Sequence, residues 1–376
     1  MDHLPPELQD EILRNLRQDK KALAACSATC RSLLPICQRH IFEYLIIGCS
    51  RIRRRLQSNS VLALPQFLQA LEDYPYVGSY VRYLEIDEEY SDPTVLGEIP
   101  LEVVKCCPNL KYLSIQADLN EDFSLNLSPK SCVPVSTSVS PQSLRINILN
   151  YRHRLRNGRT WLKACAKNGI DLTRLKTLHA EVYRFVGDHA FFGDIMRYCA
   201  SSLEEFTLCP GSKVAAREGV EPSVPIDLSI LSNLRIFSIR LRVIYDFNRL
   251  MWLDSTPWFL RLFKTLLKRL PNPLEELNIC INHQSSGSLQ NHLWFEVLVD
   301  LLMDKKKFPL FRRFAILIGS FDDENAQKAI ESMKYHFRKI NMRGVEIDFA
   351  THIGDADYNL RAFTPDPLWP IETCFS

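Results

Sequence analysis

The sequence lacks the features of metal-binding, secreted and membrane-spanning proteins. Its 376 residues include twelve cysteines, but no two form a CxxC pair, and no Cys or His pair follows Cys26 and Cys30 at zinc-ligand spacing. No run of about 18 apolar residues could cross a bilayer, and acidic residues interrupt the N-terminus where a signal peptide would be apolar. We therefore expect an intracellular protein, in the cytoplasm, the nucleus or both, with reduced thiols, no metal and no membrane contact.

Motifs of the common catalytic sites are absent as well. There is no G-x-x-x-x-G-K-[ST] or G-x-G-x-x-G loop, no G-x-S-x-G elbow and no H-E-x-x-H pair. The nine histidines are dispersed, and Cys199 and Cys209 have no base nearby in the sequence that would activate a thiolate. The formal net charge of +2 gives no general attraction to nucleic acid. The sequence thus predicts a protein that is not an enzyme, has no cofactor and does not bind nucleic acid.

The first 47 residues carry three helical patterns. Pro5 and Pro6 open the first, where a missing backbone N–H costs little, and Asp19 is a suitable N-cap for the second. The apolar side chains recur at helical spacing: Leu8, Ile12, Leu13 and Leu16; Leu23, Cys26 and Cys30; Leu34, Cys37, Ile41 and Leu45. Three helices this short bury too little surface to be stable alone, so we expect them to share their apolar face with the rest of the chain or with a partner protein.

These helices resemble an F-box, in particular the fungal type. The segments LPPELQDEILRNL and LAACSATCRSLLPICQRHIFEYL carry the resemblance, although Leu33 stands where many members of the family have tryptophan. In that family the motif binds a Skp-type adaptor of a cullin-RING ubiquitin ligase. The alternative is a plain helical cap on the repeats that follow. The resemblance implies these adaptor-binding residues: Leu4, Pro5, Leu8, Ile12, Leu34 and Pro35.

From residue 81 onward one pattern recurs: an apolar residue, two others, an apolar residue, one other and an apolar residue. Nine copies begin 28 to 40 residues apart: VRYLEI at 81–86, LKYLSI at 110–115, SLRINI at 143–148, LKTLHA at 175–180, LEEFTL at 203–208, LRIFSI at 234–239, LEELNI at 274–279, FRRFAI at 311–316 and MRGVEI at 342–347. Each hexapeptide predicts a short strand, and amphipathic helices are expected between several of them. Because one such unit cannot bury its own apolar face, neighbouring units must stack.

The repeats resemble a leucine-rich-repeat horseshoe, with parallel strands lining the concave face and helices outside. The asparagine that this family places after the triplet is present only as Asn282, so we expect uneven curvature. The expected fold class is α/β: an N-terminal three-helix F-box followed by an irregular leucine-rich-repeat solenoid. We expect the F-box at 1–47, a linker and capping helix at 48–80, with the helix at 61–77, the solenoid at 81–363 and a C-terminal tail at 364–376.

The residues between the apolar positions of each triplet are expected to form the concave face. Their charges alternate in sign, which favours recognition of a protein surface over a uniform phosphate track. The predicted substrate-binding residues are Arg82, Glu85, Lys111, Lys176, His179, Glu204, Arg235, Glu275 and Arg312.

Both resemblances imply one function, that of a substrate-recognition adaptor subunit of a Skp–cullin–F-box ubiquitin ligase. The F-box would bind the Skp-type adaptor, and the solenoid would bind an unknown protein substrate. In such an assembly the chain supplies proximity and no reacting group. The alternative is an F-box and leucine-rich-repeat interaction scaffold that acts without ubiquitin transfer.

Overall fold

A computed structural model describes most of the chain as two compact units, Met1–Leu178 and His179–Ser376. The residues that it describes are 4–17, 19–48, 61–62, 64–87, 103–117, 138–148, 158–167, 169–182, 185–210, 226–246, 251–254, 256–283, 293–320, 327, 330, 331, 334 and 344–353. The division falls inside strand β6 (Thr177–Val182). The units are described separately below as unit 1 and unit 2.

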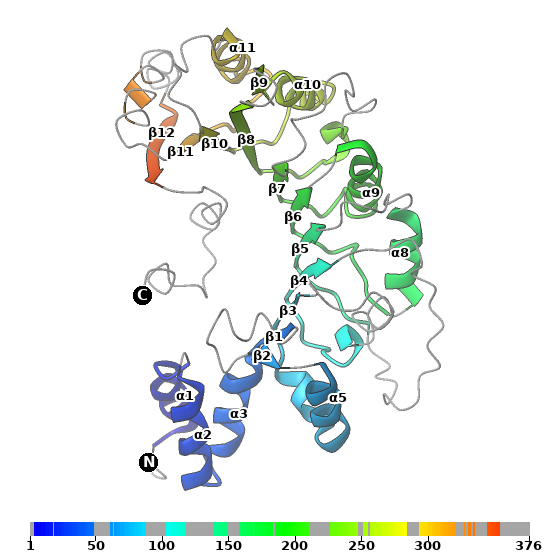
Figure 1. The fold of residues 1–376 in the computed structure, drawn as a ribbon, viewed down its shortest axis with the longest axis vertical. Helices are drawn as coiled ribbons and strands as arrows, with labels where there is room; N and C mark the ends of the chain where they lie inside the picture. Colours follow the sequence, from blue (N-terminus) through cyan, green and yellow to red (C-terminus); the bar gives the residue numbers. More distant parts are fainter. Residues whose placement is uncertain are drawn as a thin grey trace. The chain divides into compact units, whose positions relative to one another are not determined.

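Unit 1 begins with the three helices that the sequence predicts: α1 (Pro6–Arg14), α2 (Lys20–Thr29) and α3 (Leu34–Glu43). Pro5 is the N-cap of α1, and the Asp19 carboxylate accepts a hydrogen bond from the Ala22 amide at 2.9 Å, which confirms the expected cap of α2. Helix α3 contacts both α1 and α2, and it also lies beside β1 (Figure 1). Their shared core contains these fully buried side chains: Leu13, Leu23, Leu33 and Cys37.

Strand β1 (Tyr44–Gly48) follows α3 without a loop. The helical pattern placed Leu45 on the third helix, and this was wrong, because Leu45 is a buried strand residue. β1 pairs in parallel with both β2 (Val61–Leu62) and β3 (Tyr83–Asp87). Aromatic and β-branched residues favour a strand at this point. The sheet therefore begins one strand earlier than the first predicted hexapeptide.

The sheet of unit 1 is parallel, in the order β2-β1-β3-β4-β5, where β4 is Tyr112–Ala117 and β5 is Ser143–Ile148. Of the helix expected at 61–77, Leu64–Asp73 form α5 and Pro75–Tyr80 form the 3₁₀ helix η1. The expected start was wrong, because Val61–Leu62 pair with β1 as strand β2. Helix α8 (Gly158–Lys167) is followed by Gly169, whose φ of +70° is the left-handed conformation in which glycine commonly ends a helix.

Unit 2 contains a second set of alternating strands and helices. The strands are β7 (Glu205–Pro210), β8 (Ile236–Asp246), β9 (Met251–Asp254), β10 (Glu276–His283), β11 (Arg313–Ser320) and β12 (Glu346–Ile353). The helices are α9 (Phe185–Tyr198), η2 (Leu228–Ile230), α10 (Thr256–Leu266) and α11 (Leu293–Leu302). Strands β7-β8-β10-β11-β12 are neighbours in parallel register, and β9 returns antiparallel along β8.

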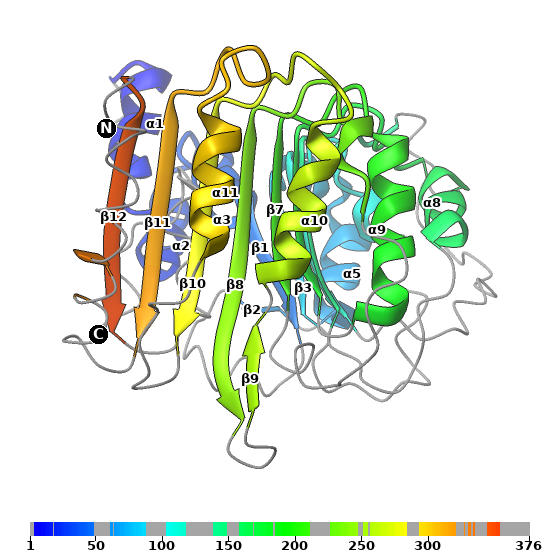
Figure 2. The same ribbon diagram turned by 90° about the horizontal axis from the view of Figure 1, so that it is seen from above.

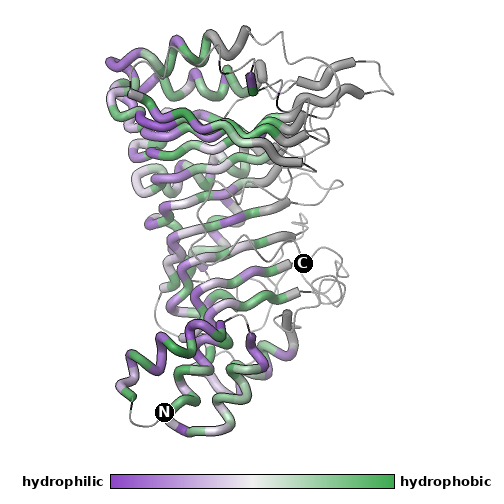
Figure 3. The backbone as a smooth tube through the Cα atoms, turned by 90° about the vertical axis from the view of Figure 1, so that its left-hand side faces the viewer, coloured by the Kyte–Doolittle hydropathy of each residue, from purple (hydrophilic) through white to green (hydrophobic). Residues whose placement is uncertain are grey.

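Helices α10 and α11 cover one face of the unit 2 sheet, as Figure 2 shows. The side chains that face them come from alternate strand positions, so each strand is apolar on one face and more polar on the other. Figure 3 shows this alternation as green and purple bands along the strands. Aromatic rings fill the interior, with Phe206 stacked on Phe237 and Phe263 stacked on Phe308, both at 5.8 Å between ring centroids.

All nine hexapeptides contribute to parallel strands, but two were placed in the wrong frame. Leu144 of β5 pairs with Leu113 of β4, and Ile347 of β12 pairs with Phe314 of β11. The apolar triplet of β5 therefore lies two residues earlier in the sequence than predicted, and that of β12 lies two residues later. Because strand side chains alternate with a period of two, each set of residues still lies on the expected face.

The prediction of an α/β fold with parallel strands and intervening helices is confirmed within each unit. The boundaries at 47, 80 and 363 stay predictions, and the tail at 364–376 lies outside the described residues. Between β11 and β12 these described residues are helical: Gln327, Ile330, Glu331 and Lys334.

Candidate functional site

The predicted adaptor-binding residues are exposed just before α1, on α1 and at the start of α3. We call this set the helix surface: Leu4, Pro5, Leu8, Ile12, Leu34 and Pro35. Leu8 is 53% exposed, Ile12 40%, Leu34 38% and Leu4 37%, and both prolines are also exposed. Leu8 and Ile12 stand one helical turn apart, so their side chains are neighbours on α1. Four large apolar side chains thus remain in contact with water on one small helical module.

The helix surface is exposed because the opposite side of α1 already fills the helical core. Leu13 is fully buried against α2 and α3, and Leu16 packs at the edge of the same cluster. The sequence pattern placed Leu8, Ile12, Leu13 and Leu16 on one stripe, and the structure divides that stripe between the core and the solvent. Burying the exposed half requires another surface.

A polar clamp fixes α1 against α3. The Asp10 carboxylate accepts hydrogen bonds from Arg39 and from His40 Nε2, the latter at 2.8 Å, and Arg17 forms an ion pair with Glu43 at 2.5 Å. His40 is only 4% exposed, and its Nδ1 lies 3.8 Å from the Glu43 carboxylate. Burial alone would raise the pKa of Glu43, but His40 and Arg17 outweigh it and lower this pKa to about 2. The clamp holds α1 in the position that exposes Leu8 and Ile12.

The clamp extends to the first strand through α2. Lys20 donates a hydrogen bond from Nζ to the Tyr44 carbonyl at 3.0 Å. Burial of the amine lowers the pKa of Lys20 to about 8. The three helices are therefore attached to the sheet by a covalent junction at Tyr44 and by this buried contact.

The predicted substrate-binding residues lie at two kinds of position. Glu85 is on β3 and His179 is on β6. The other seven stand one residue before a strand: Arg82, Lys111 and Lys176 in unit 1, and Glu204, Arg235, Glu275 and Arg312 in unit 2. Within each unit, backbone hydrogen bonds connect these pre-strand positions in sequence order.

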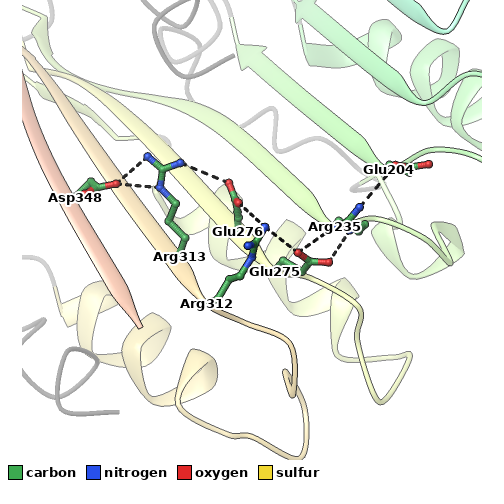
Figure 4. A network of polar contacts seen from close by, with 7 residues as sticks. All are labelled: Glu204, Arg235, Glu275, Glu276, Arg312, Arg313 and Asp348. Carbon is green, nitrogen blue, oxygen red and sulfur yellow. Dashed lines mark hydrogen bonds and ion pairs between the residues drawn. The ribbon is translucent and has the colours of Figure 1, made fainter. Parts of the chain in front are cut away.

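In unit 2 the pre-strand residues are linked by ion pairs, and Figure 4 shows this network, which we call the charged row. Arg235 donates two hydrogen bonds to Glu275, at 2.5 and 3.1 Å, and lies 4.0 Å from Glu204. Arg312 also reaches Glu275, at 3.1 Å, so one carboxylate lies between two guanidinium groups. Its members are Glu204, Arg235, Glu275, Glu276, Arg312, Arg313 and Asp348.

Three members of the charged row were not predicted from the sequence: Glu276, Arg313 and Asp348. Arg312 is 3.2 Å from Glu276, and Arg313 is paired with Asp348 at 2.8 Å and lies 3.9 Å from Glu276. Glu276 and Arg313 occupy the third position of their hexapeptides, directly before the second apolar residue. In a strand that position shares a face with the fifth position, so strict alternation would have identified both.

Two carboxylates of the charged row are shielded from water, and this shielding strengthens their ion pairs with the arginines. The side chains of Glu275 and Glu276 are only 15% and 14% exposed, whereas Arg235, Arg312 and Arg313 are 41–63% exposed. The hydrogen bond from Arg235 lowers the pKa of Glu275 below its usual value, and the charges of Arg235 and Arg312 add to this effect against the opposing effect of burial. At its centre the row therefore presents arginine side chains outward, with Glu275 and Glu276 more deeply buried than the arginines.

Next to the charged row, the same sheet face is polar but buried. The Asn278 amide donates to Ser238 Oγ at 3.1 Å, and both side chains are at most 4% exposed, as is Thr207 on the neighbouring strand. Cys209 is 1% exposed and lies 3.7 Å from Nε2 of His179. A thiol this buried is not accessible to a substrate from solution. Burial also raises the pKa of Cys199 to about 12, so this thiol stays protonated at neutral pH.

No cluster of three metal-ligand side chains occurs among the residues that the structure describes. Within the same residues, every helix is too short or too polar to cross a membrane. No protein-family model matches the chain, and no curated protein shows significant similarity to it.

Proposed function

We propose that the chain is the substrate-recognition adaptor of a Skp–cullin–F-box ubiquitin ligase. The helix surface binds the Skp-type adaptor, and the sheet faces of the two units bind a target protein. The observation that carries the proposal is the exposure of Leu4, Leu8, Ile12 and Leu34 on helices whose own core is already filled. Exposed apolar clusters of this kind are typical of interaction sites.

The arrangement also suits an adaptor mechanically. The clamp of Asp10, Arg39 and His40 fixes α1, and β1 follows α3 with no intervening loop. A partner bound at Leu8 and Ile12 is therefore held at a defined position on unit 1. Proximity is the whole contribution of such a subunit to ubiquitin transfer.

Co-purification with a Skp-type adaptor tests the helix surface. Full burial of a leucine contributes about 1.5–3 kcal/mol, so Leu4→Asp combined with Leu8→Asp should weaken capture by at least about 100-fold. The matched control is Leu270→Asp combined with Leu310→Asp, which changes two leucines of unit 2 that are 52% and 55% exposed. The control should capture the adaptor as the wild type does.

Two results would contradict the assignment. Undiminished capture by the Leu4 and Leu8 variant would show that another surface binds the adaptor. Absence of capture by a folded wild-type chain would exclude the ligase role. Capture without ubiquitin transfer in the reconstituted complex would instead favour an interaction scaffold.

A further inference from the structure

In unit 1 the residues immediately before successive strands form an evenly spaced row. The amide of Lys111 donates to the Arg82 carbonyl, that of Gln142 to Lys111 and that of Lys176 to Gln142. Adjacent strands lie about 4.8 Å apart, so these side chains leave the sheet edge at regular intervals. We call Arg82, Lys111, Gln142 and Lys176 the basic row.

The basic row differs from its counterpart in unit 2. There the same positions alternate in sign, and the arginines are paired with Glu275. In unit 1 Arg82 and Lys111 are adjacent, and like charges side by side on a sheet are destabilising. Glu43, which precedes β1, interacts with Arg82. Lys111 and Lys176 are both exposed.

Beside the basic row lies a row of aromatic side chains. Tyr44, Tyr83 and Tyr112 occupy equivalent positions on β1, β3 and β4, on the face opposite the buried leucines. The rings of Tyr83 and Tyr112 are 6.2 Å apart at 36°, and all three tyrosines are half-buried. Tyr44 donates its hydroxyl hydrogen to Glu85 at 2.9 Å. Tyrosine rings provide large, rigid contact area at low entropic cost.

We propose that this face of unit 1 binds an extended, acidic peptide segment of a target protein, with acidic side chains on Lys111 and Lys176 and aromatic or apolar side chains on the tyrosine row. The inference rests on the proposed function where it calls the bound protein a target. Lys111 and Lys176 are two strand spacings apart, about 10 Å. A segment of about four extended residues spans that distance.

Charge distribution favours a peptide over a nucleic acid. Glu85 lies two residues after Tyr83 on β3 and therefore on the same strand face as the tyrosines. Glu43 stands at the end of the basic row. A nucleic-acid strand carries one charge per roughly 3.4 Å, which would bring phosphates against these carboxylates. A peptide can place its acidic groups over the lysines alone.

Fluorescence anisotropy with the full-length chain tests the proposal. The probe is a labelled 12-residue peptide that alternates Glu and Tyr, compared with its Gln–Tyr counterpart and with a 12-nucleotide oligothymidylate. The acidic peptide should bind, more weakly as salt rises. Lys111→Glu combined with Lys176→Glu should weaken binding by at least about tenfold, because two attractive contacts become repulsive.

The matched control is Lys305→Glu combined with Lys306→Glu, which makes the same change in net charge at two exposed lysines of unit 2. It should bind the acidic peptide as the wild type does. If the charge reversal at Lys111 and Lys176 prevents folding, Lys111→Gln with Lys176→Gln replaces it and should weaken binding in the same direction.

Four results would overturn the proposal: wild-type affinity in the Lys111 and Lys176 variants, an equal loss in the control, equal binding of the Gln–Tyr peptide, or tighter binding of the oligonucleotide through the same lysines. Capture of the Skp-type adaptor is measured on the same variants and should be unchanged. Failure of peptide binding with intact capture refutes only this inference, whereas peptide binding without capture refutes only the ligase role.

Discussion

Replacing Gly78 by alanine should destabilise unit 1 although it adds only one methyl group. Gly78 is buried in η1, which contacts both α3 and α5. A Cβ atom there would lie 1.9 Å from the Cys106 carbonyl oxygen and 3.3 Å from Leu71 Cδ2. Since real Cβ contacts shorter than 3.0 Å are essentially never observed, backbone atoms would have to separate by more than 1 Å, and no side-chain rotation can relieve this.

The neighbourhood of Cys106 allows little movement. Val103, Val104 and Cys107 are all fully buried, so a shift of this carbonyl displaces packed core. Overpacking of this kind costs about 1–3 kcal/mol. For a unit of this size that corresponds to a fall of about 2–12 °C in Tm.

Differential scanning calorimetry measures the change, and hydrogen exchange locates it. Exchange should accelerate in the segments around η1 and residues 103–110. The control is Gly193→Ala in α9, where the nearest atom to the new Cβ is Arg197 Nη2 at 3.6 Å. Alanine there should stabilise the helix by about 0.5–1 kcal/mol. Wild-type stability in the Gly78 variant would refute the close packing of η1 on Cys106.

The strands and helices were largely predictable because their signals are local. Asp19 caps α2, the proline pair opens α1, and each apolar hexapeptide contributes to a strand. The errors arose where local signals are ambiguous. Residues 44–47 continue the helical stripe of α3 and also read as a short apolar strand, and only pairing with β3 selects the strand. The antiparallel β9 has no apolar hexapeptide and was missed.

The candidate surfaces were less predictable because they depend on tertiary contacts. Periodicity cannot distinguish the exposed Leu8 from the buried Leu13, since α3 determines which side of α1 is covered. Asp10 and Glu43 gave no sequence signal for the clamp, because their partners lie on other elements. The alternating signs of the charges before the strands of unit 2 were visible in the sequence, but the ion pairs that join these residues and the shielding of Glu275 and Glu276 were not predicted.

Two further substitutions test the interior and the clamp. Phe263→Ala should lower the free energy of unfolding of unit 2 by about 3–5 kcal/mol in chemical denaturation, because the fully buried ring contacts Phe259 and Phe308. Glu43→Gln should remove an acid-sensitive contribution from unit 1. The pKa of Glu43 is about 2 in the folded protein, against an ordinary value of 4.5, so the folded state favours the carboxylate. This stabilisation is complete above pH 4.5, is lost as the pH falls toward 2, and amounts to at most about 3 kcal/mol. The difference in unfolding free energy between the wild type and Glu43→Gln should therefore shrink steadily between pH 5 and pH 2.5 in urea titrations. A difference that stays constant across this range would show that Arg17 and His40 do not stabilise the charged form, and the clamp would then have no electrostatic basis.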